Sequence, residues 1–362
     1  MIDFEPSEEQ QLIVDAVRGF AQNEVRKAAR DADEAWKLPA ALLQAAHELG
    51  VTTAALPEAY GGGGSRSAVT GALVAEELAW GDLSLALGIL SPGLIALPVA
   101  DFGTEEQKRR LLPRFTGDVY APGSLAILEP GLRSDVLKPA TRARREGAGY
   151  LLEGEKCLVP WQDGLQEVLV VASEDGRPQA FLVPANASGL EATRERNLGL
   201  QAFPTAELRL GGVRVPAEAR LGGEAGCDVR ALVARGRVAL AAAAVGVARA
   251  SFELAREYAK ERQTFGAPIA TRQSIAFKVA DMAIEIDGAR LLGWEAAWRL
   301  DQGLDATREA ALARHQSSRV SLEVADGAVQ VFGGHGYTRE YLPEMHLRNA
   351  RGFALFEALA LV

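Results

Sequence analysis

Apolar residues in the first third of the chain recur at the three- and four-residue spacing of amphipathic helices. Ser7 precedes two glutamates and then an apolar series, which makes it a good candidate for a helix N-cap. Pro39 opens a second helical segment, and a third covers residues 67–80, after the glycine-rich stretch 56–64. We therefore expect residues 1–120 to form a helical domain.

The pattern changes between residues 121 and 222. Residues 167–172, 179–184 and 206–215 are short runs rich in branched aliphatic side chains and bounded by Gly, Pro, Asp or Asn, which is typical of strands. No helical segments alternate with them, so we expect an antiparallel, barrel-like sheet rather than a parallel one. The charged cluster 142–146 (RARRE) is expected in a solvated turn or strand.

Long helical patterns return in residues 223–362. Residues 228–262 contain no proline and would extend roughly 50 Å as a helix. Residues 272–302 and 305–331 predict two more long helices. This region is expected to be a C-terminal four-helix bundle, so the whole fold is predicted to be mainly α with a central β domain.

Composition excludes several classes of protein. The net charge is −9, and Lys and Arg are spread along the chain, which argues against nucleic acid or an acidic membrane as the main partner. The acidic N-terminus predicts no signal peptide, and the apolar segment 83–100 contains prolines, so we expect buried helices with a bend rather than a membrane span. Two cysteines and four histidines form no metal-ligand spacing, so no metal site and a reducing cytoplasmic location are predicted.

Two glycine-rich motifs taken alone predict only turns. The run GGGG at 61–64 lacks the GK[ST] that completes a phosphate-binding loop. The run GGHG at 333–336 follows a helical pattern, not a strand, so it is no dinucleotide fingerprint.

Seven segments, taken in chain order, together resemble the acyl-CoA dehydrogenase family of flavoproteins. They are LPEAYGGGG (56–64), GTEEQKRRLLP (103–113), LEPGLRSD (128–135), GEKCLVP (154–160), RVALAAAAVGVA (237–248), ERQTFGAPIATRQ (261–273) and QVFGGHGYTREYLPEMHLRNAR (330–351). The last two match highly specific signatures, and the resemblance runs from near residue 4 almost to the end of the chain. The family's order of helical, β and helical domains is also the order predicted above.

The chemistry of that family sets what the site must contain. Oxidising an acyl thioester at Cα–Cβ needs a base for the α proton, charge stabilisation at the thioester oxygen, and a flavin to accept the β hydride. The resemblance places the base at Glu357, where Phe353, Leu355 and Phe356 would supply an apolar pocket. Without the resemblance, this glutamate would be taken for a surface residue near a frayed C-terminus. Some family members carry the base just before RVAL, where this chain has Gly236.

The resemblance also implies that two subunits share each FAD. The adenosine and pyrophosphate end would be bound by a neighbouring subunit through two motifs, RQTF and QVFGG. The residues concerned are Arg262, Thr264, Phe265, Gln330, Gly333 and Gly334. An arginine can neutralise pyrophosphate, and glycines let the main chain approach it closely. The simpler alternative is a charge at a helix end followed by C-cap glycines.

The positions expected at the flavin-ring end depart from the family pattern. Leu128 stands where the family has the Thr before EPG, and Leu158 and Pro160 stand for the Trp and Thr of WIT. Proline has neither a hydroxyl nor a main-chain N–H, so both donors near flavin N5 and O4 are lost. A register shift could bring Trp161 into the stacking role without replacing the hydroxyl. Ser134 is retained, so binding of the ring is weakened rather than abolished.

Three functions follow from this reading. The first is an active dehydrogenase for acyl-CoA or another acyl thioester, with Arg237 and Ser134 as substrate contacts, an electron-transfer flavoprotein or similar acceptor, and a homo-oligomeric assembly. The second is a partner subunit that completes the FAD site of another chain in a hetero-oligomer, which the altered ring positions favour and Glu357 opposes. The third is a flavin monooxygenase. Glu357 argues against it, because that chemistry has no use for an α-proton base.

Overall fold

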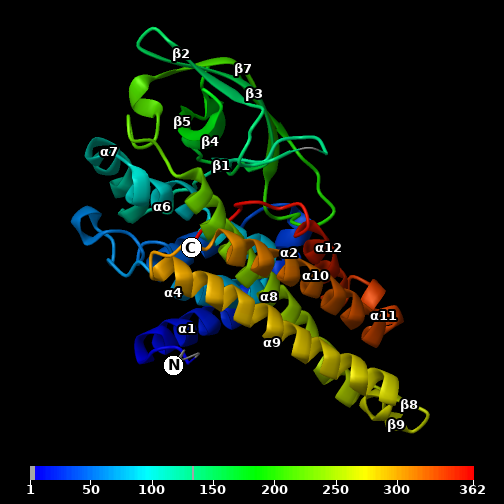
Figure 1. Ribbon diagram of the computed structural model, residues 1–362. Helices are drawn as coiled ribbons and strands as arrows, with labels where there is room; N and C mark the ends of the chain where they lie inside the picture. Colours follow the sequence, from blue (N-terminus) through cyan, green and yellow to red (C-terminus); the bar gives the residue numbers. More distant parts are fainter. Residues whose placement is uncertain (1–4, 133) are drawn as a thin grey trace.

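The computed structural model describes residues 5–132 and 134–362, and it consists of a curled sheet and two helical regions that lie together on one side of the sheet (Figure 1). A π-helical turn, Ala21–Val25, joins the first two helices of the N-terminal region. The helices of that region are α1 (Glu8–Phe20), α2 (Arg26–Ala35), α3 (Ala40–Glu48), α4 (Ala68–Gly81), α5 (Leu83–Leu90), α6 (Gly93–Phe102) and α7 (Glu105–Thr116). The predicted order of helical, β and helical regions is confirmed.

Side-chain caps set where these helices begin. The Ser7 hydroxyl accepts the Gln10 N–H at 3.2 Å, and the Gln10 side chain accepts the Ser7 N–H at 2.9 Å, which completes a capping box at α1. The Ser67 hydroxyl caps α4 by accepting the Thr70 N–H. The helix starts predicted at these two serines are confirmed.

The apolar segment 83–100 forms α5 and α6, which meet at a bend of 40° and are almost entirely buried. Length and composition alone would let this bent pair, or helix Val229–Glu261, cross a membrane. However, 83% of the apolar window of the long helix is buried inside the protein. Burial in the core therefore accounts for the apolar composition of helix Val229–Glu261. The prediction of bent, buried helices at 83–100 is confirmed.

The middle region is one seven-stranded sheet. Its strands are β1 (Leu125–Ala126), β2 (Arg142–Glu146), β3 (Gly149–Pro160), β4 (Glu167–Glu174), β5 (Arg177–Pro184), β6 (Leu190–Arg194) and β7 (Thr205–Pro216). They lie in the order β1-β4-β2-β3-β7-β6, with β5 also paired to β4. Pairing is antiparallel except that β4 runs parallel to β1 and to the first residue of β2, Arg142. Parallel neighbours need long connections, and the β2–β3 hairpin lies within the one between β1 and β4.

Three long helices dominate the C-terminal region. They are α8 (Val229–Glu261), α9 (Gln273–Asp301) and α10 (Thr307–Phe332), followed by the short α11 (Gly334–Tyr337) and α12 (Pro343–Gly352). The hairpin of β8 (Gln263–Thr264) and β9 (Ala267–Pro268) lies at the tip of α8 and α9 (Figure 1). A Cβ at Gly246 of α8 would lie 2.3 Å from the Glu76 carbonyl oxygen of α4, so small residues on α8 allow the two helices to touch.

Candidate active site

Helix α12 leads the chain to Glu357 and is fixed at two of the residues of its RNAR motif. Arg348 donates to the buried carboxylate of Asp33 in α2, with Nη2 2.7 Å from Oδ2. The Asn349 side-chain oxygen accepts the main-chain N–H of Leu200 at 2.8 Å. The motif therefore anchors α12 to both the N-terminal helices and the β domain, and it does so with buried polar groups that are costly to leave unpaired.

The turn between α12 and Glu357 is tightly packed. The rings of Phe353 and Phe356 meet edge to face at 5.8 Å between centroids, and both are buried. A Cβ at Gly352 would lie 2.0 Å from the tip of the Phe356 ring, so a larger residue there would displace that ring. Helix α10 holds the turn from the other side, where Arg314 donates to the Phe356 carbonyl and Ser318 to the Phe353 carbonyl.

Glu357 lies inside the protein between two arginines. Its carboxylate accepts from Arg237 of α8 at 3.1 Å and 3.3 Å, and Nε of Arg314 lies 3.9 Å away. The Glu357 side chain is only 15% exposed, and residues 358–362 beyond it are buried, so it does not lie on a frayed terminus. The prediction of an apolar pocket around Glu357 is wrong. The two phenylalanine rings of the turn are buried in the core, and Leu355 is 65% exposed. The Glu357 carboxylate faces two guanidinium groups instead.

The position before RVAL cannot carry a rival base in this fold. A Cβ at Gly236 would lie 2.9 Å from both Cα and Cβ of Ala358. Ala358 itself has a left-handed backbone with φ of 49°, an uncommon conformation for a residue with a side chain. The chain just after Glu357 therefore fills the space that a side chain at 236 would need.

Leu158 lies in a bulge of β3. The register with β7 shifts between Lys156 and Val159, and Leu158 takes a left-handed backbone with φ of 52°. Its main-chain N–H donates to Glu195 Oε1 at 3.1 Å. Among the described residues, Glu195 Oε2 is buried without a hydrogen-bond partner. Sequence reasoning missed Glu195, because its contact with residue 158 exists only once β3 and the segment after β6 are folded together.

The other positions expected at the flavin ring offer few donors. The Pro160 carbonyl is occupied by the Ser124 hydroxyl at 2.7 Å, and Leu128 is a partly buried apolar residue. Ser134 is exposed, and its hydroxyl oxygen accepts the Glu129 N–H at 3.3 Å. Of the four ring positions predicted from the sequence, Ser134 alone carries a side-chain hydrogen-bond donor.

A buried ion pair joins the two segments that carry the expected flavin-ring positions, through Glu129 and Lys156. Lys156 of β3 donates to Glu129 at 2.9 Å, and the Glu129 carboxylate also accepts the N–H groups of Ala140 and Thr141. Burial opposes ionisation of Glu129, but Lys156 and these donors hold its pKa below the usual value. Burial lowers the pKa of Lys156, and the pairing with Glu129 opposes that shift. Glu129 is therefore bound to the strand that carries Leu158 and Pro160.

The residues predicted to contact a neighbour's FAD lie at one end of the long helices. Ala255 and Ala259 near the end of α8 pack on Ala328 and Val331 near the end of α10, and Figure 1 shows the β8–β9 hairpin and α11 following these ends. The six predicted residues are at least partly exposed: Arg262, Thr264, Phe265, Gln330, Gly333 and Gly334. Within the part of the chain that the structure describes, the Arg262 side chain has no hydrogen bond or ion pair. The surface is thus free to meet a ligand or another chain.

Three family models cover the chain in order. They are the N-terminal domain of acyl-CoA dehydrogenase at residues 7–117, the middle domain at 124–213 and the C-terminal domain at 228–357. The chain belongs to the acyl-CoA dehydrogenase family. The resemblance inferred from the sequence motifs is confirmed.

The chain matches relatives over nearly its whole length. It is 37% identical to the probable acyl-CoA dehydrogenase YngJ of Bacillus subtilis (strain 168), over 97% of this chain and 94% of that protein. Butyryl-CoA dehydrogenase from Megasphaera elsdenii has a similar structure, with a TM-score of 0.89, 31% identity, and coverage of 98% and 96% of the two chains. A glutaryl-CoA dehydrogenase from Mycobacterium smegmatis, solved in complex with FADH2, gives a TM-score of 0.87 at 29% identity and covers 97% and 91%.

Acyl-CoA dehydrogenases are FAD-dependent oxidoreductases, so the predicted enzyme class and cofactor are confirmed at the level of the family. The fit to FAD differs between the two ends of the expected FAD site. The end near Arg262 and Gly333 fits, because it offers a guanidinium without a partner among the described residues and a glycine with open space around it. The ring end fits less well, because Leu158 and Pro160 contribute no side-chain donor there.

Proposed function

We propose that this chain oxidises a saturated acyl-CoA or related acyl thioester at Cα–Cβ, with Glu357 as the base. The position of Glu357 carries the proposal, because the turn that presents it is fixed by α10 and anchored through the RNAR motif. A surface glutamate would need no such support. The alternative of a non-catalytic partner subunit is favoured by the altered ring positions together with the retained motifs for a neighbour's FAD, and the partly buried Glu357 carboxylate, which two arginines approach, opposes it.

The residues of the chain suggest how the proton is moved. Glu357 is paired with Arg237 in the structure, so the carboxylate must turn from that guanidinium to reach the α carbon of a bound thioester. The Cα–H bond then breaks with its proton going to Glu357, the hydride leaves Cβ, and a double bond forms between the two carbons. The flavin, when bound, supplies the hydride acceptor at its N5. An electron-transfer flavoprotein or similar acceptor would then take the electrons.

Arg262→Ala is expected to weaken FAD retention in the assembled protein. The exposed guanidinium has no partner among the described residues, and we assign it to the pyrophosphate of a neighbour's FAD. Losing a charge-assisted hydrogen bond costs about 1.5–3 kcal/mol of binding free energy, which raises the dissociation constant of FAD roughly 10- to 150-fold. The measurement is FAD release on dilution, followed by flavin fluorescence. Arg256→Ala is the control, because Arg256 is an exposed arginine on the same helix whose guanidinium pairs with Glu257 and lies over the Phe252 ring; equal FAD affinity in both variants would contradict the shared site.

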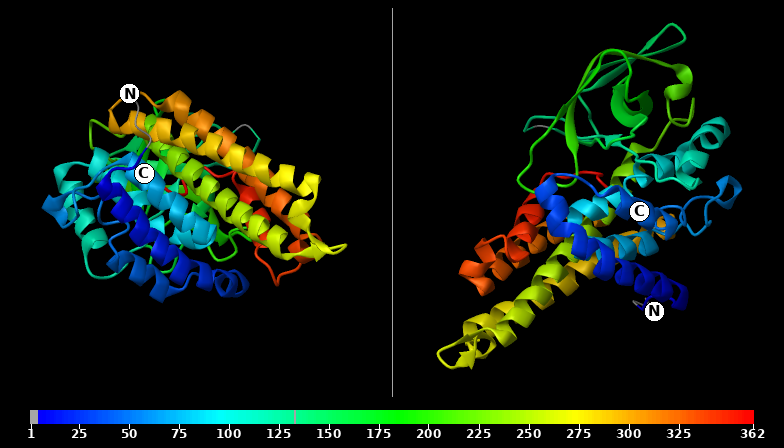
Figure 2. Two further views of the ribbon diagram at one scale, coloured as in Figure 1. Left: turned by 90° about the horizontal axis from the view of Figure 1, so that it is seen from below. Right: turned by 180° about the vertical axis from the view of Figure 1, so that it is seen from behind.

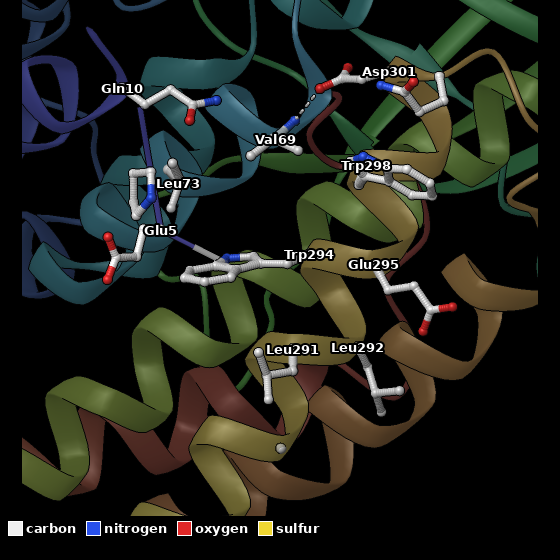
Figure 3. Close-up of a pocket in the computed structure, with 13 residues that line it drawn as sticks. Glu5, Gln10, Val69, Leu73, Leu291, Leu292, Trp294, Glu295, Trp298 and Asp301 are labelled. Carbon is white, nitrogen blue, oxygen red and sulfur yellow. Dashed lines mark hydrogen bonds between the residues drawn. The ribbon is translucent and has the colours of Figure 1, made fainter. Parts of the chain in front are cut away.

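Helix α9 carries a stripe of exposed apolar side chains that we assign to subunit assembly. The stripe is formed by Phe277, Ile284, Leu291 and Trp298, which are between 42% and 69% exposed and spaced seven residues apart. Figure 2 shows α9 on the outside of the helical region. At its C-terminal end the stripe borders a groove of about 610 Å³, where Trp294 and Trp298 face Val69 and Leu73 of α4 (Figure 3). Such a surface favours burial against another chain.

Ile284→Asp is expected to break or weaken the oligomer. The residue lies in the middle of the apolar stripe, and burying an unpaired carboxylate there is strongly unfavourable. Size-exclusion chromatography with light scattering would report a smaller species. Leu12→Asp is the control, because Leu12 is similarly exposed but lies on α1. An unchanged mass for the Ile284 variant would remove α9 from the proposed interface.

A further inference from the structure

Arg314 makes contacts that the proposed reaction has not used. From α10 its Nε donates to the Phe356 carbonyl at 3.1 Å, Nη2 donates to the same oxygen, and Nη1 reaches the Ser318 hydroxyl at 3.3 Å. Nε also lies 3.9 Å from the Glu357 carboxylate. We propose that Arg314 is a positioning residue for Glu357, which fixes the main chain just before the base; this inference rests on the proposed role of Glu357.

The burial of Arg314 shows that the contact is not an ordinary surface interaction. Its side chain is 13% exposed, whereas Arg319 on the same helix is 41% exposed and pairs with Glu285 and Glu323. Burial lowers the pKa of the Arg314 guanidinium, and Glu357 partly opposes that shift. Burying a guanidinium costs free energy unless its donors are satisfied. Here the Phe356 carbonyl accepts two of those donors, so the largely buried guanidinium holds the main chain of the turn in place.

The two arginines beside Glu357 therefore have different tasks. Arg237 binds the carboxylate itself, so this pair must open before the proton can be taken. Arg314 binds the carbonyl of the preceding residue, a contact that can persist while the side chain of Glu357 turns. Ser318, one turn further along α10, holds the Phe353 carbonyl in the same way at 3.4 Å. With the main chain held at both ends of the turn, only side-chain torsions of Glu357 need to change.

Such positioning matters because proton transfer depends on reach. A displacement of about 1 Å in a catalytic group can cost on the order of 10²-fold in rate. Arg314→Gln removes the two-point contact with the Phe356 carbonyl, so the turn and the carboxylate gain freedom. Arg314→Lys keeps a cation but presents its donors from a single nitrogen, so it should restore part of the rate. The substrate would bind as before, because Arg314 acts on the base and not on the thioester.

The test uses the holoenzyme with its flavin reduced by dithionite, in D2O without oxygen. Hydride transfer is then blocked, and exchange of the α hydrogen of saturated acyl-CoA thioesters, from butyryl-CoA to palmitoyl-CoA, reports the base alone. We expect Arg314→Gln to slow exchange by about 10- to 100-fold, with an unchanged KM in the turnover assay and Arg314→Lys in between. Arg319→Gln is the control, and thermal melting and FAD content are measured for every variant.

The outcomes separate this inference from the reaction on which it depends. Wild-type exchange in Arg314→Gln would overturn the positioning role. A loss of rate that follows a loss of FAD or of thermal stability, with no rescue by Arg314→Lys, would show that Arg314 acts only on folding, which also overturns it. Exchange at the wild-type rate in Glu357→Gln would instead overturn Glu357 as the base.

Discussion

Glu357→Gln is expected to slow acyl-thioester-dependent flavin reduction by about 10²–10⁴-fold. The amide keeps nearly the shape of the carboxylate but cannot accept the α proton. Gly236, the position of the base in some relatives, carries no side chain and faces Ala358, so no second carboxylate can replace it there. The measurement is anaerobic bleaching of the flavin absorbance after mixing with acyl-CoA in a stopped-flow instrument.

A matched variant separates this chemical loss from a loss of structure. Glu174→Gln also removes a partly buried carboxylate paired with an arginine, since Glu174 accepts from Arg220 at 2.7 Å in the β domain. It should leave the rate of flavin reduction unchanged. Both variants should retain their FAD, as measured by absorbance per chain. Reduction of the flavin at the wild-type rate in Glu357→Gln would mean that another group takes the proton.

Features set by local sequence were predictable, and the structure shows why. The caps at Ser7 and Ser67 depend on side chains within three residues of the helix start. The long helix α8 follows from a proline-free run of small residues. The strands at 167–174 and 177–184 follow from branched residues between turn signals. Each signal is contained in the segment that it shapes.

Features set by contacts between distant segments were not predictable in the same way. Arg314 and Glu357 are separated by two helices, and nothing in the local sequence distinguishes Arg314 from the other arginines of α10. The expected apolar pocket failed for a related reason. Sequence adjacency placed Phe353 and Phe356 next to the base, but the turn directs their rings into the core and the carboxylate toward Arg237.

The altered ring positions lead to a second large expected effect: the wild-type chain expressed alone should purify with less than one FAD per chain. The family pattern has a Trp and a Thr where this chain has Leu158 and Pro160. The missing aromatic contact is worth about 0.5–1.5 kcal/mol, and each missing hydrogen bond about 0.5–1.5 kcal/mol net. Together they amount to roughly 2–4 kcal/mol, or about 30- to 1,000-fold in affinity.

Restoring both side chains should therefore raise the FAD content. Leu158 already has a left-handed backbone, and leucine and tryptophan both carry a Cβ, so Leu158→Trp adds little backbone strain beyond what is present. Pro160→Thr returns a hydroxyl and a main-chain N–H at the end of β3. We expect the double variant to approach one FAD per chain by absorbance, and to exceed the sum of the two single variants if both groups contact one ring. Val119→Trp, at an exposed position after α7, controls for an added tryptophan. If the wild-type chain instead holds one tightly bound FAD, groups other than residues 158 and 160 hold the flavin ring. Glu195 would then be the first candidate, because it accepts the Leu158 N–H and its other oxygen has no partner among the described residues.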